Sequence, residues 1–289
     1  MEDRETKEKI LPLLPLRGLT IFPYMVLHFD VGRQKSIAAL EEAMVKDQSI
    51  FLVTQKDAKV DSPTVDDIYK VGTVSKIKQL LKLPGDTIRV LVEGINRGEI
   101  IEITKEDPYF EAKIGLREEV SSDEDKMEEE ALMRSIINIF EKYVKLSNRI
   151  SPETLLSVTT VEDAAQLGDL IAANVLVKTE DKQEILEAFE PKTRLEKLYG
   201  ILTKEIEILE IERKISLRVK KQIDKVQREY YLREQMKAIQ KELGENDGLA
   251  GEIEEYRERI EKANLPEEAN EKALKELERL RKMSPGSAE

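Results

Sequence analysis

Side chains that could act as catalytic nucleophiles or bases are scarce in this chain. There is one histidine, His28, and there is no cysteine. His28 lies in the apolar run Tyr24–Phe29 with no serine or cysteine beside it that needs a base, so a packed or half-exposed structural histidine is favoured over a catalytic one. Glutamate and aspartate are abundant, but helix faces account for them, and no isolated pair stands in an apolar setting that would separate two pKa values. We therefore predict no catalytic residues.

Motifs that bind cofactors or metals are also missing from the sequence. The phosphate-binding pattern G-x-x-x-x-G-K-[ST] does not occur, and neither does the nucleophile pattern G-x-S-x-G. One histidine and no cysteine leave a structural zinc site with almost no ligands. The sequence predicts that these residues bind no cofactor and no metal.

The overall composition narrows the class of protein. The chain has 289 residues, is 40% hydrophobic and 37% charged, and has a formal net charge of -12. Phosphate contacts need a basic surplus, so this charge argues against a dedicated nucleic-acid binder. The start, MEDRETKEK followed by ILPLLPLRGL, is neither a signal peptide nor a membrane span, which needs about 20 apolar residues. With no cysteine for disulfides, we expect a cytoplasmic protein that does not contact a membrane.

Residues 1–118 are predicted to form a β-rich lobe with one or two helices. The apolar runs Ile10–Leu16 and Ile21–Val31 have strand character, but both are interrupted by proline. The prolines are Pro12, Pro15 and Pro23. Because proline cannot donate to a sheet ladder, we expect these runs at sheet edges, strand starts or bulges. Gln34–Val45 has the spacing of a short amphipathic helix, and a strand at Ile50–Val53 follows it.

The clearest hairpin of the sequence joins Gly72–Leu83 to Thr87–Glu93 through the turn Pro84-Gly85-Asp86. The second strand alternates apolar and polar residues, which is typical of a half-buried strand. Two further strands are expected at Ile95–Thr104 and Tyr109–Leu116. The turn signals around them are Asn96, Gly98 and Asp107-Pro108.

Beyond the β-rich lobe, the sequence changes to helical periodicity. Residues 119–130 are predicted to be an acidic linker or a fraying helix start, because a run this charged buries too little surface to order itself. Residues 131–192 are predicted to form a small helical bundle. Ser151-Pro152-Glu153 has the pattern of a helix N-terminus, and two more helices are expected at Val161–Leu176 and Lys182–Phe189.

A long, coiled-coil-like helix is predicted for residues 193–244. Its apolar positions keep a seven-residue repeat that then drifts, and we expect them to be buried against the bundle or against another chain. The residues assigned to this assembly face are Leu202, Leu209, Ile215, Ile223, Tyr230, Leu232, Met236 and Ile239. A basic strip at residues 213–228 follows a run of glutamates. It could bind phosphate, but a solvated face paired with acidic neighbours is favoured in so acidic a chain.

Residues 245–289 are predicted to form a short helical tail. Gly244, with Asn246, Asp247 and Gly248, is expected to stop the long helix. One further helix is indicated by Tyr256 and its apolar neighbours, and Asn264-Leu265-Pro266 is expected to cap another. The last residues, MSPGSAE, look like an interrupted chain. The predicted fold class is α+β.

Three motifs, in this order along the chain, resemble the N-terminal region of the bacterial Lon proteases. They are LPLLPLRGLTIFPYMVLHFDVGRQKSIAALEEAM, IKQLLKLPGDTIRVLVEGINRGEI and EYYLREQMKAIQKELGE. The resemblance covers essentially the whole chain. Lon proteases continue into an AAA+ ATPase module and a protease module with a Ser–Lys dyad, and this sequence ends where the ATPase module would begin. Walker motifs, pore loops and the dyad have no matching position here.

The resemblance implies a PUA-like lobe, a helical lobe and a long helix in a truncated ATP-dependent serine endopeptidase (endopeptidase La). It also implies a role in capturing unfolded, damaged or degron-bearing proteins, some of them regulatory, and delivering them to the ATP-driven ring. By resemblance, ATP and magnesium belong to the full-length parent, which assembles as a homohexamer. Two other classes stay open, a free-standing coiled-coil adaptor and a nucleic-acid-binding module. A Walker A motif beyond the last residue would decide for Lon, and salt-dependent DNA or RNA binding would favour the nucleic-acid module.

Substrate capture is predicted at the hairpin tip, residues 78–86. The segment Leu80-Leu81-Lys82-Leu83-Pro84 has apolar side chains on both faces of a strand, and only one face can enter the core. We expect Leu80 to point outward. The residues predicted to form a patch for unfolded protein are Leu80, Leu81, Leu83 and Pro84. The alternative is that a neighbouring helix covers the second face and that any exposed leucine is idle.

Overall fold

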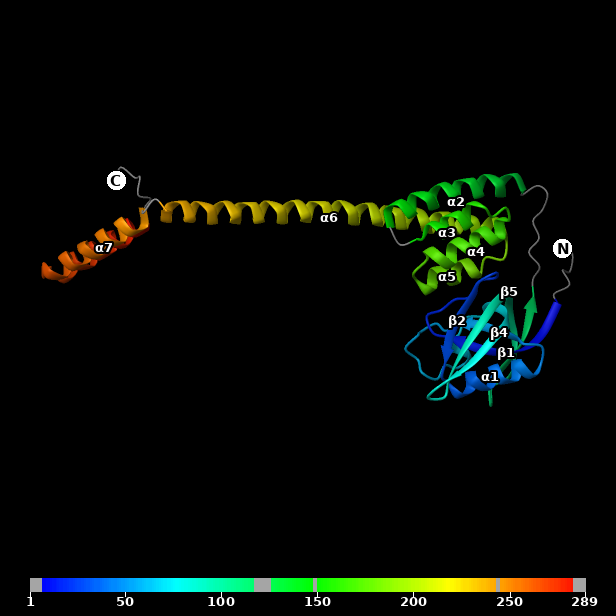
Figure 1. Cartoon of the computed structure of the whole chain (residues 1–289). Coiled ribbons are helices and arrows are strands. Elements are labelled where there is room, and N and C mark those ends of the chain that lie inside the picture. The colour runs from blue at the N-terminus through cyan, green and yellow to red at the C-terminus, as the bar shows by residue number, and fades with distance from the viewer. Residues whose placement is uncertain (1–6, 117–125, 148–149, 243–244, 283–289) are drawn as a thin grey trace. The chain divides into compact units, whose positions relative to one another are not determined.

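The computed structural model describes residues 7–116, 126–147, 150–242 and 245–282 (Figure 1). The chain divides into two compact units, Met1–Ile211 and Glu212–Glu289. The first unit contains a β lobe, residues 7–116, and a helical lobe, residues 126–206. The long helix α6 (Pro191–Glu242) contributes to both units.

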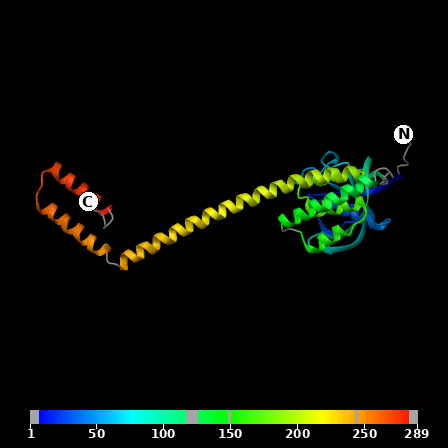
Figure 2. The same cartoon turned by 90° about the horizontal axis from the view of Figure 1, so that it is seen from above.

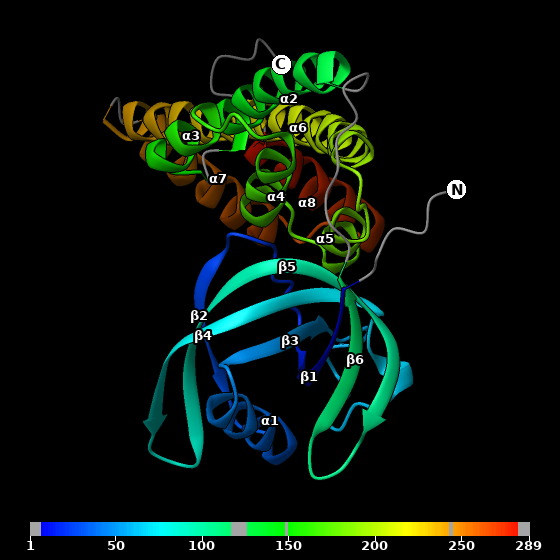
Figure 3. The ribbon, with the colours of Figure 1, turned by 90° about the vertical axis from the view of Figure 1, so that its right-hand side faces the viewer.

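The β lobe is a six-stranded sheet that closes on itself. Its strands are β1 (Lys7–Leu16), β2 (Val26–Val31), β3 (Ser49–Thr54), β4 (Val71–Leu83), β5 (Thr87–Lys105) and β6 (Phe110–Leu116). The strand order is β2-β5-β4-β3-β1-β6, and a further pairing of β5 with β6 closes five strands into a barrel (Figure 3). Helix α1 (Gln34–Val45) and the short 3-10 helix η1 (Val65–Asp67) complete the lobe.

Strand β5 makes the closure possible because it is one continuous strand of 19 residues. Its first half pairs with β2 and its second half with β6, while β4 lies along the other side. We expected a turn at Asn96 and Gly98, and this expectation is wrong. The glycines serve close packing instead: a Cβ on Gly98 would lie 2.5 Å from Cγ2 of Ile114, and one on Gly94 would lie 2.2 Å from the carbonyl oxygen of Phe22.

β1 has a neighbouring strand on each side, but each of its two prolines lies at a point where one side of the strand is open, a local edge as expected. β1 pairs antiparallel with β6 up to Leu13 and parallel with β3 from Leu13 onward. Pro12 therefore has a neighbour only in β6, and Pro15 has one only in β3. Each proline has one open side, so its missing N–H need not remove a ladder hydrogen bond.

The second proline-containing run is a strand only in its later part. β2 begins at Val26, and Pro23 precedes it in a loop whose residue Tyr24 has a φ of 62°. A left-handed residue after a proline ends any extended run at that point. β2 lies at the end of the strand order, so the expectation of an edge is confirmed for this run. The predicted helix at Gln34–Val45 and strand at Ile50–Val53 are also confirmed.

The helical lobe is built from α2 (Lys126–Ser147), α3 (Pro152–Thr159), α4 (Ala164–Val175), α5 (Thr179–Leu186) and the first part of α6. The hydroxyl of Ser151 accepts from the backbone N of Thr154 at 3.2 Å, which confirms the predicted helix start. Asp163 caps α4 in the same way, accepting from Gln166 N at 2.7 Å. Residues 117–125, most of the predicted linker, lie outside the described residues, and α2 begins at Lys126.

The two lobes share one core and one set of buried charges. Phe22 and Val71 of the β lobe join the apolar cluster of the helical lobe. Arg97 of β5 forms two hydrogen bonds to the carboxylate of Asp169, and their side chains are only 1% and 2% exposed. Arg194 lies 3.4 Å from the same carboxylate and is itself fully buried. One carboxylate therefore holds two arginines at the junction of the lobes.

The second unit ends in a helical hairpin, α7 (Glu245–Lys262) and α8 (Glu267–Lys282), which lie side by side in Figure 2. The two predicted helices are confirmed. We predicted that Gly244, Asn246, Asp247 and Gly248 together separate the long helix from the next one. The separation is shorter than predicted, because α7 already includes residues 246–248. Residues 243–244 lie outside the described residues.

Candidate functional site

The tip of the β4–β5 hairpin has the predicted form. Leu83 pairs with Thr87, and the loop between them consists of Pro84, Gly85 and Asp86. Gly85 and Asp86 have φ values of 84° and 54°, a left-handed pair that reverses the chain. The tip thus presents a tight turn at the end of two well-paired strands.

The side chain of Leu80 does not point outward as predicted. It packs against the apolar cluster that includes Leu40 of α1 and Ile77. The cause is a bulge: the register shifts between Ile77 and Gln79, so Lys78 is an extra residue and every later side chain changes face. Leu81 therefore faces solvent in place of Leu80.

The apolar surface left at the tip is small. Leu81 is 52% exposed, Pro84 is exposed, and Leu83 is half-buried. Ion pairs flank it: Lys78 Nζ lies 2.5 Å from Glu93 Oε2, and Lys82 Nζ lies 3.9 Å from Glu41 Oε1. The tip therefore has a small apolar surface bordered by charged side chains. A surface of this size could contact only a few residues of an extended polypeptide.

The predicted assembly face of α6 divides into a buried and an exposed part. Leu202 is fully buried in the helical lobe and Leu209 is half-buried. Every described side chain from Ile211 to Ile239, here called the exposed segment of α6, is exposed within this chain. The predicted assembly residues in this segment are Ile215, Ile223, Tyr230, Leu232, Met236 and Ile239. Burial of these residues against another chain stays a prediction.

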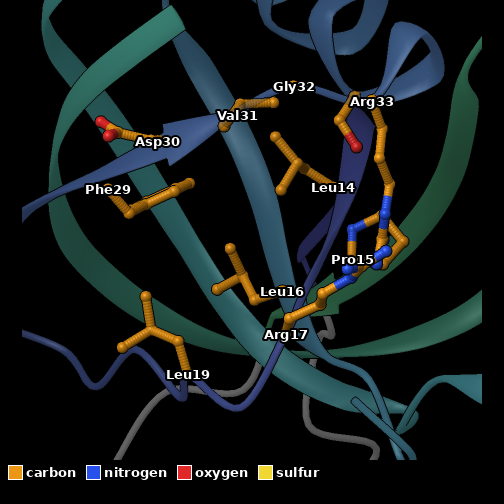
Figure 4. Close-up of a pocket in the computed structure, with 11 residues that line it drawn as sticks. Leu14, Pro15, Leu16, Arg17, Leu19, Phe29, Asp30, Val31, Gly32 and Arg33 are labelled. Atoms are coloured by element: carbon orange, nitrogen blue, oxygen red, sulfur yellow. The ribbon is translucent and has the colours of Figure 1, made fainter. Parts of the chain in front are cut away.

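A cleft in the β lobe was not predicted from the sequence. It has two parts, of about 370 Å³ and about 330 Å³, which share Pro15, Arg33 and Ser36 as lining residues. Apolar side chains line the first part (Figure 4). They are Leu14, Leu16, Leu19, Phe29 and Val31. The cleft lies where β1, β2 and the start of α1 meet.

Two arginines at this cleft have different surroundings. Arg17 pairs with Asp61, Nη2 to Oδ1 at 2.6 Å, on the surface. Arg33 instead donates through Nη2 to Oε1 of Gln55 at 2.9 Å. Gln55 is 1% exposed, and its amide nitrogen is held by the carbonyls of Asp57 and Val60 at 2.6 and 2.7 Å. A fixed, buried amide thus positions the Arg33 guanidinium.

The charge of Arg33 is not balanced by a nearby carboxylate. Burial, followed by the charge of Arg17, lowers the pKa of Arg33, and Asp61 opposes this only in part. No described carboxylate lies in ion-pair distance of Arg33. One feature of the sequence could have drawn attention to Arg33. This arginine occupies the N-cap position of α1, where Ser, Thr, Asp or Asn is usual.

The remaining titratable groups of the β lobe have structural environments. His28 is exposed on β2, with no arrangement for base catalysis around it in the described residues. Asp30 is held by Arg89 in a bidentate pair at 2.7 and 2.9 Å, and this hydrogen bonding lowers the pKa of Asp30. No group of three or more metal-ligating side chains occurs in the described ranges. Among those ranges, no helix has both the length and the apolar character needed to cross a membrane.

Sequence comparisons find a family model and curated relatives that match this chain. Residues 10–204 match the family model described as the ATP-dependent protease La (LON) substrate-binding domain. The Lon protease of Heliobacterium modesticaldum is 55% identical over 290 residues, which cover 100% of this chain and 35% of that protein. The Lon protease of Desulforamulus reducens is 60% identical over 282 residues, which cover 97% of this chain and 34% of that protein. The chain thus spans about a third of the length of these curated relatives.

A solved structure has a similar fold. The N-terminal domain of a Mycobacterium avium complex Lon protease aligns with a TM-score of 0.55 over 68% of this chain and 98% of that chain. The two sequences are 18% identical over the aligned part, so the likeness concerns the fold alone.

Proposed function

We propose, because the chain belongs to the family of ATP-dependent protease La (LON) substrate-binding domains, that it captures unfolded or damaged protein segments and passes them to an ATP-driven protease. The observation that carries this proposal is the family match over residues 10–204, a range that contains all but the first three residues of the β lobe and includes its exposed hairpin tip. Unfolded chains differ from folded ones chiefly in their exposed apolar side chains, so a capture site needs apolar surface of its own.

The hairpin tip is our proposed capture site within the matched range. The contact residues are Leu81, Leu83 and Pro84, with Leu80 supporting them from beneath. Leu81 is exposed on a strand that is paired with its neighbour, so its backbone is already ordered before a ligand binds.

The exposed segment of α6 has a second role in this proposal, which is assembly with other copies of the chain. It lies beyond residue 204, outside the matched substrate-binding range. A helix with this many apolar side chains in water gains most of its stability from packing one face, and a second copy offers a matching face. A hexameric parent would bring several such helices together.

Activity, cofactors and location of the whole protein belong to the same proposal. The relatives are named Lon proteases, and the chain spans about a third of their length. ATP and magnesium would act in the part of the protease that this chain does not span, since the sequence has no P-loop pattern. Degradation of misfolded, damaged and some regulatory proteins, in the cytoplasm, is the function that we expect of the parent.

Binding of casein, an unfolded protein, tests the capture site. We expect Leu81→Ser with Leu83→Ser to weaken binding about tenfold, because each serine removes apolar contact area from the tip. The thermal midpoint should change little, because neither Leu81 nor Leu83 belongs to the buried core. A matched control is Ile10→Ser with Ile101→Ser, two residues of the same lobe that are 56% and 50% exposed and lie away from the tip.

Fluorescence anisotropy with labelled casein would measure these affinities. Unchanged affinity in the folded tip variant would move the capture site elsewhere in the lobe. If the unsubstituted chain fails to bind casein at all, the proposed function is wrong.

A further inference from the structure

Strand β2 has one open edge, because β5 is its single neighbour among the described strands. The backbone N of Gly94 donates to the carbonyl of Met25 at 2.9 Å, so these two residues form a hydrogen-bonded pair at the start of the β2–β5 ladder. Bonded and non-bonded pairs alternate along an antiparallel ladder, so every second residue of β2 directs its N–H and C=O away from β5. These residues are Val26, His28 and Asp30.

The cleft of the β lobe lies beside this open edge. Phe29 of β2 lies on one side of its first part, of about 370 Å³, and Leu14 and Leu16 of β1 lie on the other side (Figure 4). A strand added to β2 would direct alternate side chains to the face on which Phe29 packs against the core. The cleft therefore has room for an apolar side chain of an added strand.

Strand β1 borders the cleft but is a poor edge for pairing. Its ladder with β6 ends at Leu13, and beyond this residue it pairs only with β3. The backbone N of Gln55 donates to the carbonyl of Leu16 at 2.9 Å, so Leu16 directs its backbone groups toward β3. Pro15, one residue earlier, directs its carbonyl to the open side and has no N–H to donate. An added strand in the cleft therefore pairs with β2.

The chemistry of the edge determines what binds to it. Backbone donors and acceptors at two-residue spacing match the backbone of another extended chain, whatever its sequence. The β2 strand of a second copy does not fit, because its Leu27 and Phe29 pack against the core of their own lobe and cannot enter the cleft. An extended segment of an unfolded polypeptide fits, because its side chains are free on both faces.

We propose that an extended, apolar segment of an unfolded polypeptide adds to β2 as an antiparallel strand and places a side chain in the cleft. The proposal rests on the proposed function and names how the β lobe recognises the backbone of a substrate. Hydrogen bonds to the main chain give affinity that does not depend on sequence, and the cleft gives a preference for apolar side chains. The edge has six residues, so the bound segment is short.

Three labelled peptides with one sequence test the proposal. Each alternates leucine and threonine over about eight residues, has both ends blocked and is long enough to cover β2. One is unmodified, one is N-methylated at every threonine and one at every leucine. In an antiparallel strand with its leucines toward the cleft, the threonine N–H groups point to β2. We expect methylation of the threonines to weaken binding to the full chain at least about tenfold, and methylation of the leucines to change it little.

A substitution in β2 tests the same edge from the other side. His28→Pro removes the central N–H of the edge, and the fold should hold because proline is tolerated where its N–H would face away from the sheet. We expect it to weaken the unmodified peptide about tenfold. His28→Ala is the matched control, because it removes the side chain but keeps the N–H, and it should bind the peptide fully. The methylated peptides keep the test valid if His28→Pro unfolds.

The outcomes separate this proposal from the proposed function. Equal binding of the two methylated peptides overturns strand addition, and so does full binding by a folded His28→Pro variant. If casein still binds in these cases, only the strand edge is wrong. If neither the unmodified peptide nor casein binds, the proposed function is wrong as well. The tip variant, Leu81→Ser with Leu83→Ser, should leave the difference between the methylated peptides unchanged.

Discussion

Two parts of helix α6 have apolar residues at similar spacing but differ in burial. They are the first part, residues 191–206, and the exposed segment, residues 211–239. In the first part, Leu195, Leu198 and Leu202 are fully buried in the helical lobe. In the exposed segment, Ile215 and Ile223 are 53% and 50% exposed. This difference shows that a heptad repeat predicts which face of a helix packs against a partner. It does not predict whether that partner belongs to the same chain or to another one.

We expect the largest loss of stability from a substitution in the lobe junction, where Arg194 of the first part of α6 contacts Asp169. Asp169→Asn keeps the shape of the side chain but removes the negative charge that contacts both Arg97 and Arg194 in the buried junction. We expect a loss of about 3–5 kcal/mol in the free energy of unfolding, measured by urea denaturation of the full chain. Glu210→Gln, which removes an exposed ion pair with Lys142, is the control and should cost about 0.5 kcal/mol or less. Similar losses in both variants would show that the junction does not depend on its buried carboxylate.

A pair of identical substitutions compares the two parts of α6 directly. Leu202→Ala leaves a cavity in the helical lobe and should destabilise the protein by about 2–5 kcal/mol. Leu232→Ala, at a leucine that is 53% exposed, should change the free energy of unfolding by about 0.5 kcal/mol or less. The same urea titration measures both. A large loss for Leu232→Ala at low protein concentration would contradict the exposure of this segment in the single chain.

The smallest expected effect on unfolding, and the most specific effect on assembly, is at Ile223. Ile223→Asp should lower the mass of the assembly that the chain forms in solution, because burying a charge in an apolar interface between helices is costly. Gln222→Asp introduces the same charge one residue away and should leave the mass unchanged. Sedimentation velocity measures both. An unsubstituted chain that stays a monomer at every concentration would refute assembly through the exposed segment.

Local patterns predicted most elements of this fold. Gln34–Val45, the hairpin turn at Pro84 and the cap at Ser151 were all predicted, because each depends on residues close in the sequence. The errors arose from contacts between distant residues. Gly98 reads as a turn signal locally, yet Ile114 requires it, and one extra residue at Lys78 exchanges the faces of Leu80 and Leu81.

The cleft could not be predicted for a similar reason. Arg33 and Gln55 lie 22 residues apart, and only the fold brings the guanidinium to the buried amide. The predicted hairpin site needed one local motif, whereas this cleft needs β1, β2 and α1 together.

The closed barrel of the β lobe has a consequence for aggregation. Among the described strands, β2 alone has a single neighbouring strand, and it has six residues; β1 and β4 have an open side over part of their length. Unpaired strand edges are templates on which unfolded chains add further strands, and charged side chains such as Asp30 and Arg89 at this edge discourage such growth. Because the barrel leaves β2 as the one strand with a single neighbour among the described strands, a lobe that binds unfolded chains, as proposed, exposes only a short edge at β2 for the addition of a further strand.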